Sequence, residues 1–97
     1  MNNPSLSIHD GVLTITVDSW VRNVFINALT TVSRERINGN TWQLKLFGGD
    51  PLFPMIVLNY DDWELLEEHR HQIVAEGKRI ALKVKLHMNN PMEDTHD

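Results

Sequence analysis

The residues best suited to acid–base chemistry are the neighbouring carboxylates Asp61, Asp62 and Glu64. Two adjacent carboxyl groups can act as general acid and general base when the environment raises the pKa of one of them. Here the cluster stands at the start of a predicted helix, where the helix dipole already favours negative charge. The sequence gives no reason for a raised pKa in so solvated a cluster, so we predict a helix start and no acid–base site.

The other residue types that support catalysis or metal binding are also not arranged for it. His69 and His71 are two positions apart, which places them on different sides of a predicted helix, whereas zinc requires three or four converging ligands. The chain has no cysteine, and neither Ser19 nor Ser33 lies in a Gly-x-Ser-x-Gly sequence. We therefore predict a protein that is not an enzyme and that has no metal and no cofactor.

Charge is distributed unevenly along the chain. The formal net charge is −4, but three of the 13 acidic residues lie in the last ten positions, so the remainder is almost neutral. A neutral body argues against a strongly basic nucleic-acid binder. One local excess of positive charge remains, on the outward side of a strand predicted over residues 79–88. It suggests nucleic-acid binding as an alternative function, through Arg79, Lys83, Lys85 and His87.

The segment Asp50-Pro51-Leu52-Phe53-Pro54 is the best candidate for a protein-binding surface. Its prolines restrict the backbone on either side of Leu52 and Phe53, so a loop can present these apolar side chains with a small loss of entropy. The alternative is that both side chains fold back as a lid over the sheet. The predicted rim of the surface is acidic and aromatic, which suits a partner with a basic surface, and it consists of Asp50, Tyr60 and Asp62.

The elements that position these residues begin with an N-terminal hairpin. Alternating apolar and polar residues predict strands over residues 5–9 and 12–17. Asp10-Gly11 is a typical two-residue turn, and such a turn pairs Ile8 with Leu13 on one apolar face.

A helix is predicted next, over residues 19–30, because apolar residues recur there at steps of three and four. Two further strands follow on either side of Asn38-Gly39-Asn40, with Arg36 opposite Trp42. The alternative is that the helix continues to Ile37.

The second half of the chain is predicted to contain a loop, two strands and a second helix. Residues 48–54 form the loop, because their prolines and glycines interrupt strand pairing. Residues 55–58 form a continuous apolar run, which predicts a strand buried on both faces. A helix over residues 61–76 ends at Gly77, and the alternation over residues 79–88 predicts the last strand.

These elements follow the order β-β-α-β-β-β-α-β and predict an α+β fold. A single small domain over residues 1–88 has two helices packed on one mixed, mostly antiparallel sheet, and residues 89–97 form a flexible acidic tail. No apolar run approaches the ~18 residues that suggest a membrane span, and the N-terminus lacks the basic region of a signal peptide. Together with the lack of cysteine, these features predict a cytoplasmic protein that does not contact membranes.

By elimination, the sequence predicts a small, non-enzymatic protein-binding accessory module of the adaptor, inhibitor or immunity type. It acts through the apolar loop and its acidic-aromatic rim, and its partner is another protein. Nucleic acid is the weaker alternative. The predicted fold also allows a homodimer that forms through an exposed sheet edge.

Overall fold

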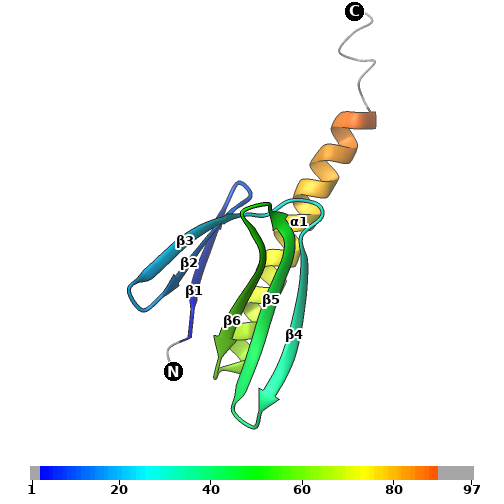
Figure 1. Cartoon of the computed structure of the whole chain (residues 1–97). Helices are drawn as coiled ribbons and strands as arrows, with labels where there is room; N and C mark the ends of the chain where they lie inside the picture. Colours follow the sequence, from blue (N-terminus) through cyan, green and yellow to red (C-terminus); the bar gives the residue numbers. More distant parts are fainter. Residues whose placement is uncertain (1–2, 90–97) are drawn as a thin grey trace, which may run out of the picture.

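The computed structural model describes residues 3–89, which form six strands followed by one helix. The first three strands make one antiparallel sheet and the next three make a second, and the helix contacts both sheets (Figure 1). Most of the predicted tail, residues 90–97, lies outside the described residues. The elements are β1 (Ser5–His9), β2 (Val12–Val17), β3 (Trp20–Phe25), β4 (Thr31–Asn38), β5 (Thr41–Asp50), β6 (Phe53–Tyr60) and α1 (Trp63–Asn89).

The predicted α+β arrangement of one sheet and two helices is therefore wrong. The protein has two three-stranded antiparallel sheets, in the orders β1-β2-β3 and β4-β5-β6, and a single C-terminal helix. Within each sheet every strand pairs with the next one in the chain, and all of these pairs are antiparallel, so no parallel crossover forms between residues 55 and 88. The errors have separate physical reasons, which the individual elements show.

The N-terminal hairpin is confirmed in its strands and in its register. Ile8 lies opposite Leu13 across β1 and β2. Asp10 and Gly11 both have positive φ angles, 47° and 78°. Two consecutive left-handed residues turn the chain in the sense that matches the twist of the strands, so the local sequence accounts for the turn and the register of this hairpin.

Residues 19–30, predicted as a helix, form β3 and the connection to β4. Asp18 has a φ angle of 54°, so Asp18 and Ser19 make a second two-residue turn instead of capping a helix. Side chains then alternate along β3, with Val24 buried and Phe25 exposed. The β-branched and aromatic residues of this segment fit a strand, and the adjacent edge of β2 provides the partner that decides between strand and helix.

The β4–β5 hairpin has the predicted register, with Arg36 opposite Trp42. Because β4 begins at Thr31, the alternative of a helix that continues to Ile37 is wrong.

The predicted loop over residues 48–54 is instead a hairpin with a bulge. β5 continues through both glycines and β6 begins at Phe53, so only Pro51-Leu52 forms the turn. Two residues of β5 stand opposite one residue of β6 at this point, and Gly48 adopts a φ of 76° that suits a bulge. Pro54 is tolerated because β6 is an edge strand, where a missing N–H breaks no ladder.

The strand predicted over residues 55–58 is confirmed as part of β6, but it is not buried on both faces. Met55 and Val57 are exposed, whereas Leu58 and Tyr60 are buried. β6 therefore has one face on the core and one face on solvent, as expected for a strand of an antiparallel sheet.

The helix predicted over residues 61–76 continues through Gly77 to Asn89, and the predicted strand over residues 79–88 is helical. Glycine inside a helix costs only about 1 kcal/mol, so Gly77 does not end α1. The last turns of α1 extend beyond both sheets (Figure 1). The alternating pattern there has no neighbouring strand to pair with, and the backbone instead forms its hydrogen bonds within the helix. Within residues 3–89, no helix is both long and apolar enough to cross a membrane.

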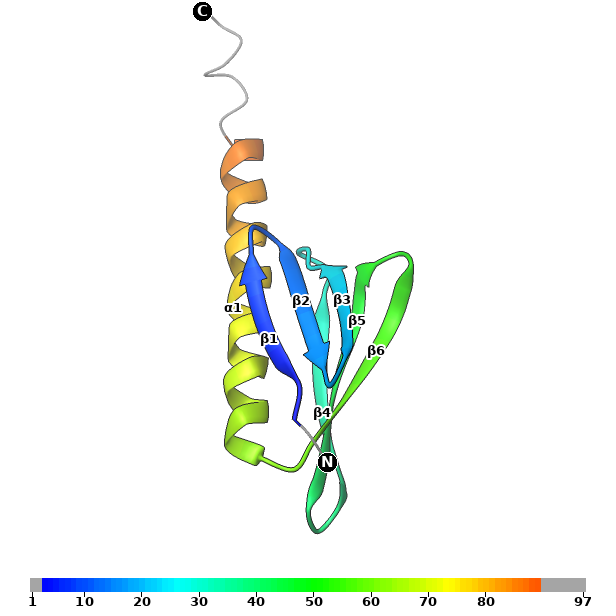
Figure 2. The ribbon, with the colours of Figure 1, turned by 90° about the vertical axis from the view of Figure 1, so that its left-hand side faces the viewer.

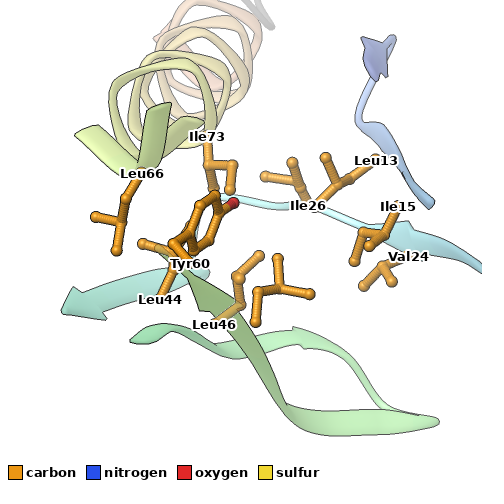
Figure 3. Close-up of a cluster of buried hydrophobic side chains, with 10 residues drawn as sticks. Leu13, Ile15, Val24, Ile26, Leu44, Leu46, Tyr60, Leu66 and Ile73 are labelled. Carbon is orange, nitrogen blue, oxygen red and sulfur yellow. The ribbon is translucent and has the colours of Figure 1, made fainter. Parts of the chain in front are cut away.

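One core joins the two sheets and α1. The helix lies alongside β1 (Figure 2) and also packs against the second sheet. Side chains from all three units point toward one another in Figure 3. Fully or almost fully buried members are Leu13, Ile15 and Val24 from the first sheet, Leu44, Leu46, Leu58 and Tyr60 from the second, Leu66 and Ile73 from α1, and Ile26 from the connection after β3.

Candidate functional site

A buried carboxylate holds the two sheets together at one end. Asp50, the last residue of β5, is only 5% exposed. Its Oδ2 accepts a hydrogen bond from the N–H of Phe25 at 3.2 Å, and its Oδ1 accepts one from the N–H of Leu52 at 2.9 Å. Because Phe25 ends β3, this side chain provides the acceptor that a neighbouring strand would otherwise supply.

The backbones approach so closely at this end that Gly49 has no room for a side chain. A Cβ atom on Gly49 would lie 2.5 Å from the carbonyl oxygen of Phe25 and 2.6 Å from the Oγ1 of Thr30. The side-chain amide of Asn27 also donates a hydrogen bond to the carbonyl of Gly49 at 2.8 Å. Specific polar contacts therefore close the gap between β3 and β5.

At the other end of β3 the two sheets separate (Figure 1). A cleft with a volume of about 570 Å³ opens between the β2–β3 turn and β6. Its two walls belong to different sheets, so a change in the angle between the sheets would change its width. The cleft is lined by Val17, Asp18, Ser19 and Trp20 on one side and by Val57, Leu58 and Asn59 on the other.

An unpaired backbone edge of β3 borders this cleft. The N–H of Phe25 points toward Asp50 and away from β2, and the direction of backbone groups alternates along an antiparallel strand. The N–H and C=O groups of Val21 and Asn23 therefore also point away from β2. No strand in the described part of the chain pairs with them, which leaves them free to bind a further strand.

The remaining sheet edges differ in how accessible they are. β6 is the second edge that borders the cleft. β1 has α1 alongside it (Figure 2). β4 carries Arg34, Glu35 and Arg36 in succession, all of them exposed, and charged side chains on an edge strand discourage pairing with other chains. The apolar edges thus face the cleft, and the protected edges lie elsewhere.

Arg22 lies beside the cleft and connects β3 with the start of β6. Its guanidinium carbon lies 4.8 Å from the ring centroid of Trp20 on β3 and 4.4 Å from the ring centroid of Phe53 on β6. Stacking of this kind is worth about 0.5–1 kcal/mol per ring at partly exposed sites. The three side chains form a stack, Trp20–Arg22–Phe53, that positions one arginine beside the opening.

The structure does not bring the predicted loop and rim together. Leu52 is 79% exposed at the β5–β6 turn, and Phe53 beside it is half-buried. The two side chains therefore do not act together, either as exposed anchors for a partner or as a lid over the sheet. Tyr60 lies at the other end of β6, about 23 Å away at 3.3 Å per residue. It is fully buried. Asp62 is exposed near the start of α1, where its Oδ1 accepts a hydrogen bond from the N–H of Leu65.

Tyr60 has a structural partner in the core. Its hydroxyl is hydrogen-bonded to Nδ1 of His69 at 2.7 Å, and both side chains are buried. Burial lowers the pKa of His69, an effect that the negative charge of Glu68 partly opposes. Burial also raises the pKa of the Tyr60 hydroxyl above its usual range. Both groups are therefore neutral near pH 7, and they link β6 to α1.

The residues of the alternative nucleic-acid site do not form one stripe, because their segment is helical. Arg79 is hydrogen-bonded to Glu76 through two nitrogen atoms. Lys83 and Lys85 are exposed but two positions apart, which places them about 200° apart around the helix. His87 lies in α1, and its side chain is outside the described part. Arg79 and Lys83 are four positions apart and so lie on one side of α1, but Lys85 does not, and the four basic residues therefore do not share a single binding face.

Within residues 3–89, no three histidine, aspartate or glutamate side chains converge as they would around a metal ion. Comparison of the chain with protein-family models, with curated proteins and with solved structures found no match.

Sequence reasoning missed Trp20, which lines the cleft, and Arg22, which stacks on Trp20. Both were assigned to a helix, where positions two apart point in different directions. The high share of β-branched and aromatic residues in this segment was the available indication of a strand. The β2–β3 turn at Asp18 could have been recognised only by accepting an aspartate, rather than a glycine, with a positive φ angle.

Proposed function

We propose that this protein is a cytoplasmic, non-enzymatic adaptor that binds an extended segment of another protein in the cleft between β3 and β6. The observation that carries the proposal is the outward-pointing backbone of Val21 and Asn23 beside an open cleft. A segment that pairs with these groups adds a fourth strand to the first sheet. Strand addition of this kind is a common mode of peptide recognition.

The side chains around the edge suit such a ligand. Backbone hydrogen bonds provide affinity for any extended segment, and side-chain pockets provide the specificity. Trp20 is 39% exposed, and together with Val57 across the cleft it offers apolar contacts. Aromatic residues at the centre of an interface often supply most of its binding energy.

The predicted binding loop contributes to this proposal in part. Phe53 stacks on Arg22 and so helps to hold that side chain in place. Leu52 remains an exposed apolar residue at the closed end, and we retain it as a contact for the body of a partner that extends beyond the bound segment. Tyr60 is buried in the core, so in this proposal it supports the fold and does not contact the partner.

Selection of random peptides displayed on phage, with the whole protein as the target, tests the proposal. We expect the selected peptides to be extended sequences with alternating apolar residues. Isotope-edited NMR of the amides then locates the binding. Val21 and Asn23 should show the largest shifts and slower hydrogen exchange, because their N–H groups gain acceptors.

The substitution Val21→Pro provides a sharper test. Proline removes the N–H that points away from β2 and leaves the ladder with β2 intact, which an edge strand tolerates. We expect Val21→Pro to lose peptide binding while its melting temperature stays within a few degrees of the parent. Val21→Ala, which keeps the N–H, is the matched control and should still bind. Peptides that bind Val21→Pro and the parent equally well would refute strand addition at β3.

A further inference from the structure

The guanidinium of Arg22 takes part in none of the ion pairs found within residues 3–89. Its contacts in this part of the chain are the two aromatic rings of Trp20 and Phe53. The rings hold the side chain but accept no conventional hydrogen bond from it. A guanidinium has five N–H donors, so this group is oriented but not satisfied by protein acceptors.

The position of Arg22 on β3 determines what it can reach. It lies opposite Ile15 of β2 in the first sheet, and Ile15 is fully buried. The backbone groups of Arg22 point toward β2, because those of its neighbours Val21 and Asn23 point away. A strand added along the free edge therefore places one residue beside Arg22 at a position without mutual backbone hydrogen bonds, where cross-strand side chains come closest.

From this geometry we infer that the segment bound in the cleft carries an aspartate or glutamate at the position beside Arg22. The inference rests on the proposed function, since it describes the ligand of the same site. A carboxylate matches the planar fork of the guanidinium and can form two parallel hydrogen bonds with it. Stacking on Phe53 and Trp20 has already ordered the arginine, so little further side-chain entropy is lost when the bond forms.

Binding also makes any other residue at this position unfavourable. A segment that covers the cleft removes water from the guanidinium of Arg22. The loss of this hydration has a large free-energy cost when the charge gains no partner. An acidic side chain replaces that water, whereas an apolar side chain does not and a basic one repels. Arg22 thus selects among extended segments that the backbone edge alone would bind equally.

The probes that test this inference are the peptides selected against the parent protein. We expect an enrichment of aspartate or glutamate at one position, on the side of the peptide that faces the interior of the cleft. Changing that residue to the neutral amide, Glu→Gln or Asp→Asn, should lower the affinity about 10- to 100-fold, as expected when one partner of a charged hydrogen bond is removed. Amidation of the peptide C-terminus should have no comparable effect, because the carboxylate that Arg22 binds belongs to a side chain.

Variants of Arg22 provide the reciprocal test. Arg22→Gln should lose the preference for acid over amide but still bind the peptide, because the edge of β3 is unchanged. Arg22→Lys, which keeps the charge without the planar fork, should retain part of the preference. Arg22→Glu should prefer a peptide with lysine at that position. If Arg22→Glu does not fold, the comparison of Arg22→Gln with Arg22→Lys still decides the question.

The outcomes separate this inference from the proposal beneath it. Peptides that depend on the Val21 N–H but show no acidic preference, or a preference that survives in Arg22→Gln, overturn the role of Arg22 and leave strand addition standing. If no peptide depends on the Val21 N–H, both the adaptor function and the acidic ligand are refuted. A preference for acid that is lost in Arg22→Gln while Val21→Pro abolishes binding supports both.

Discussion

At one end of β3, the carboxylate of Asp50 and the bare backbone of Gly49 hold the two sheets together, whereas at the other end the sheets separate around a cleft. The outward-pointing N–H of Phe25 in β3 thus has a hydrogen-bond acceptor, whereas the outward-pointing backbone groups of Val21 pair with no strand in the described chain. The difference shows how a small protein can fix two sheets without a continuous ladder between them. One side chain supplies the acceptor at the closed end, and the open end keeps a backbone edge for a partner.

The closed end should contribute most to stability and the open end most to binding. Asp50→Ala is expected to have the largest effect on stability, because it removes the acceptor of the Phe25 and Leu52 N–H groups. Hydrogen bonds to a charged group are worth about 1.5–3 kcal/mol each, so we expect the two to contribute about 3–6 kcal/mol to the free energy of unfolding in urea. Asp50→Asn, which keeps one acceptor oxygen, should lose less. A loss no larger than that of an exposed carboxylate such as Glu64 would show that the sheets are held together elsewhere.

Gly49→Ala should have the next largest effect. The new Cβ would meet the Phe25 carbonyl at 2.5 Å and force the closed end apart, and such overpacking typically costs about 1–3 kcal/mol. Gly39→Ala is the matched control, because the nearest atom to its Cβ would be a flexible arginine nitrogen 4.0 Å away. Chemical denaturation should show a change within about 0.5 kcal/mol for this control. Equal effects of the two substitutions would contradict the close approach at Gly49.

At the open end, Trp20→Ala should reduce peptide affinity more than it reduces stability. It removes a partly exposed ring and one cation–π contact, so we expect a loss of stability of about 1–2 kcal/mol. The affinity for selected peptides should fall by about 2 kcal/mol or more if Trp20 anchors the ligand. Trp63→Ala, which alters a ring of the same fractional exposure that packs against Trp42, should leave peptide binding unchanged in a fluorescence titration.

The smallest expected effect is a pH dependence that arises from the buried pair at the end of β6. Burial lowers the pKa of His69 in the folded protein, so the unfolded chain takes up a proton at a higher pH than the folded protein does. Stability should therefore decrease as the pH falls below about 6.5, by up to ~1.4 kcal/mol per pH unit, until the pH reaches the folded pKa. Melting temperatures between pH 7.5 and 5.5 will measure this decrease.

Two variants show which histidine causes that pH dependence. His69→Gln should remove it, and His71→Gln should not, because His71 is exposed. The two carboxyl groups with a lowered pKa, Glu67 and Glu76, do not add to it in this range. The hydrogen bonds from Arg79 lower the pKa of Glu76 to about 2, so the stability contributed by Glu76 is present above about pH 4.5 and is lost only as the pH falls further toward that value. A slope that persists in His69→Gln would mean that another group titrates.

Local sequence was sufficient to predict the elements whose structure depends on adjacent residues. The Asp10-Gly11 turn and its flanking alternation specify the first hairpin and its register, and the turn near Gly39 does the same for β4 and β5. The start of α1 was predictable within two residues, because acidic residues cluster there. None of these features needs a distant part of the chain.

Distant parts of the chain decided the remaining elements. Residues 20–25 have apolar positions that fit either a helix or a strand, and the free edge of β2 made them a strand. Residues 79–88 alternate as well as any strand, yet no sheet edge lies beside the last turns of α1, so those residues form their hydrogen bonds within the helix.

The candidate site depended on such distant contacts almost entirely. Composition and spacing alone indicated a small globular protein with no motif for catalysis or metal binding. They pointed to the binding of another protein only by elimination. The cleft, the unpaired backbone of Val21 and the stack of Arg22 on Phe53 arise between β3 and β6, which are separated by most of the second sheet in the chain. Short-range patterns specify turns and registers because the groups involved are close in sequence. A site between two sheets forms only when the core has set their relative positions.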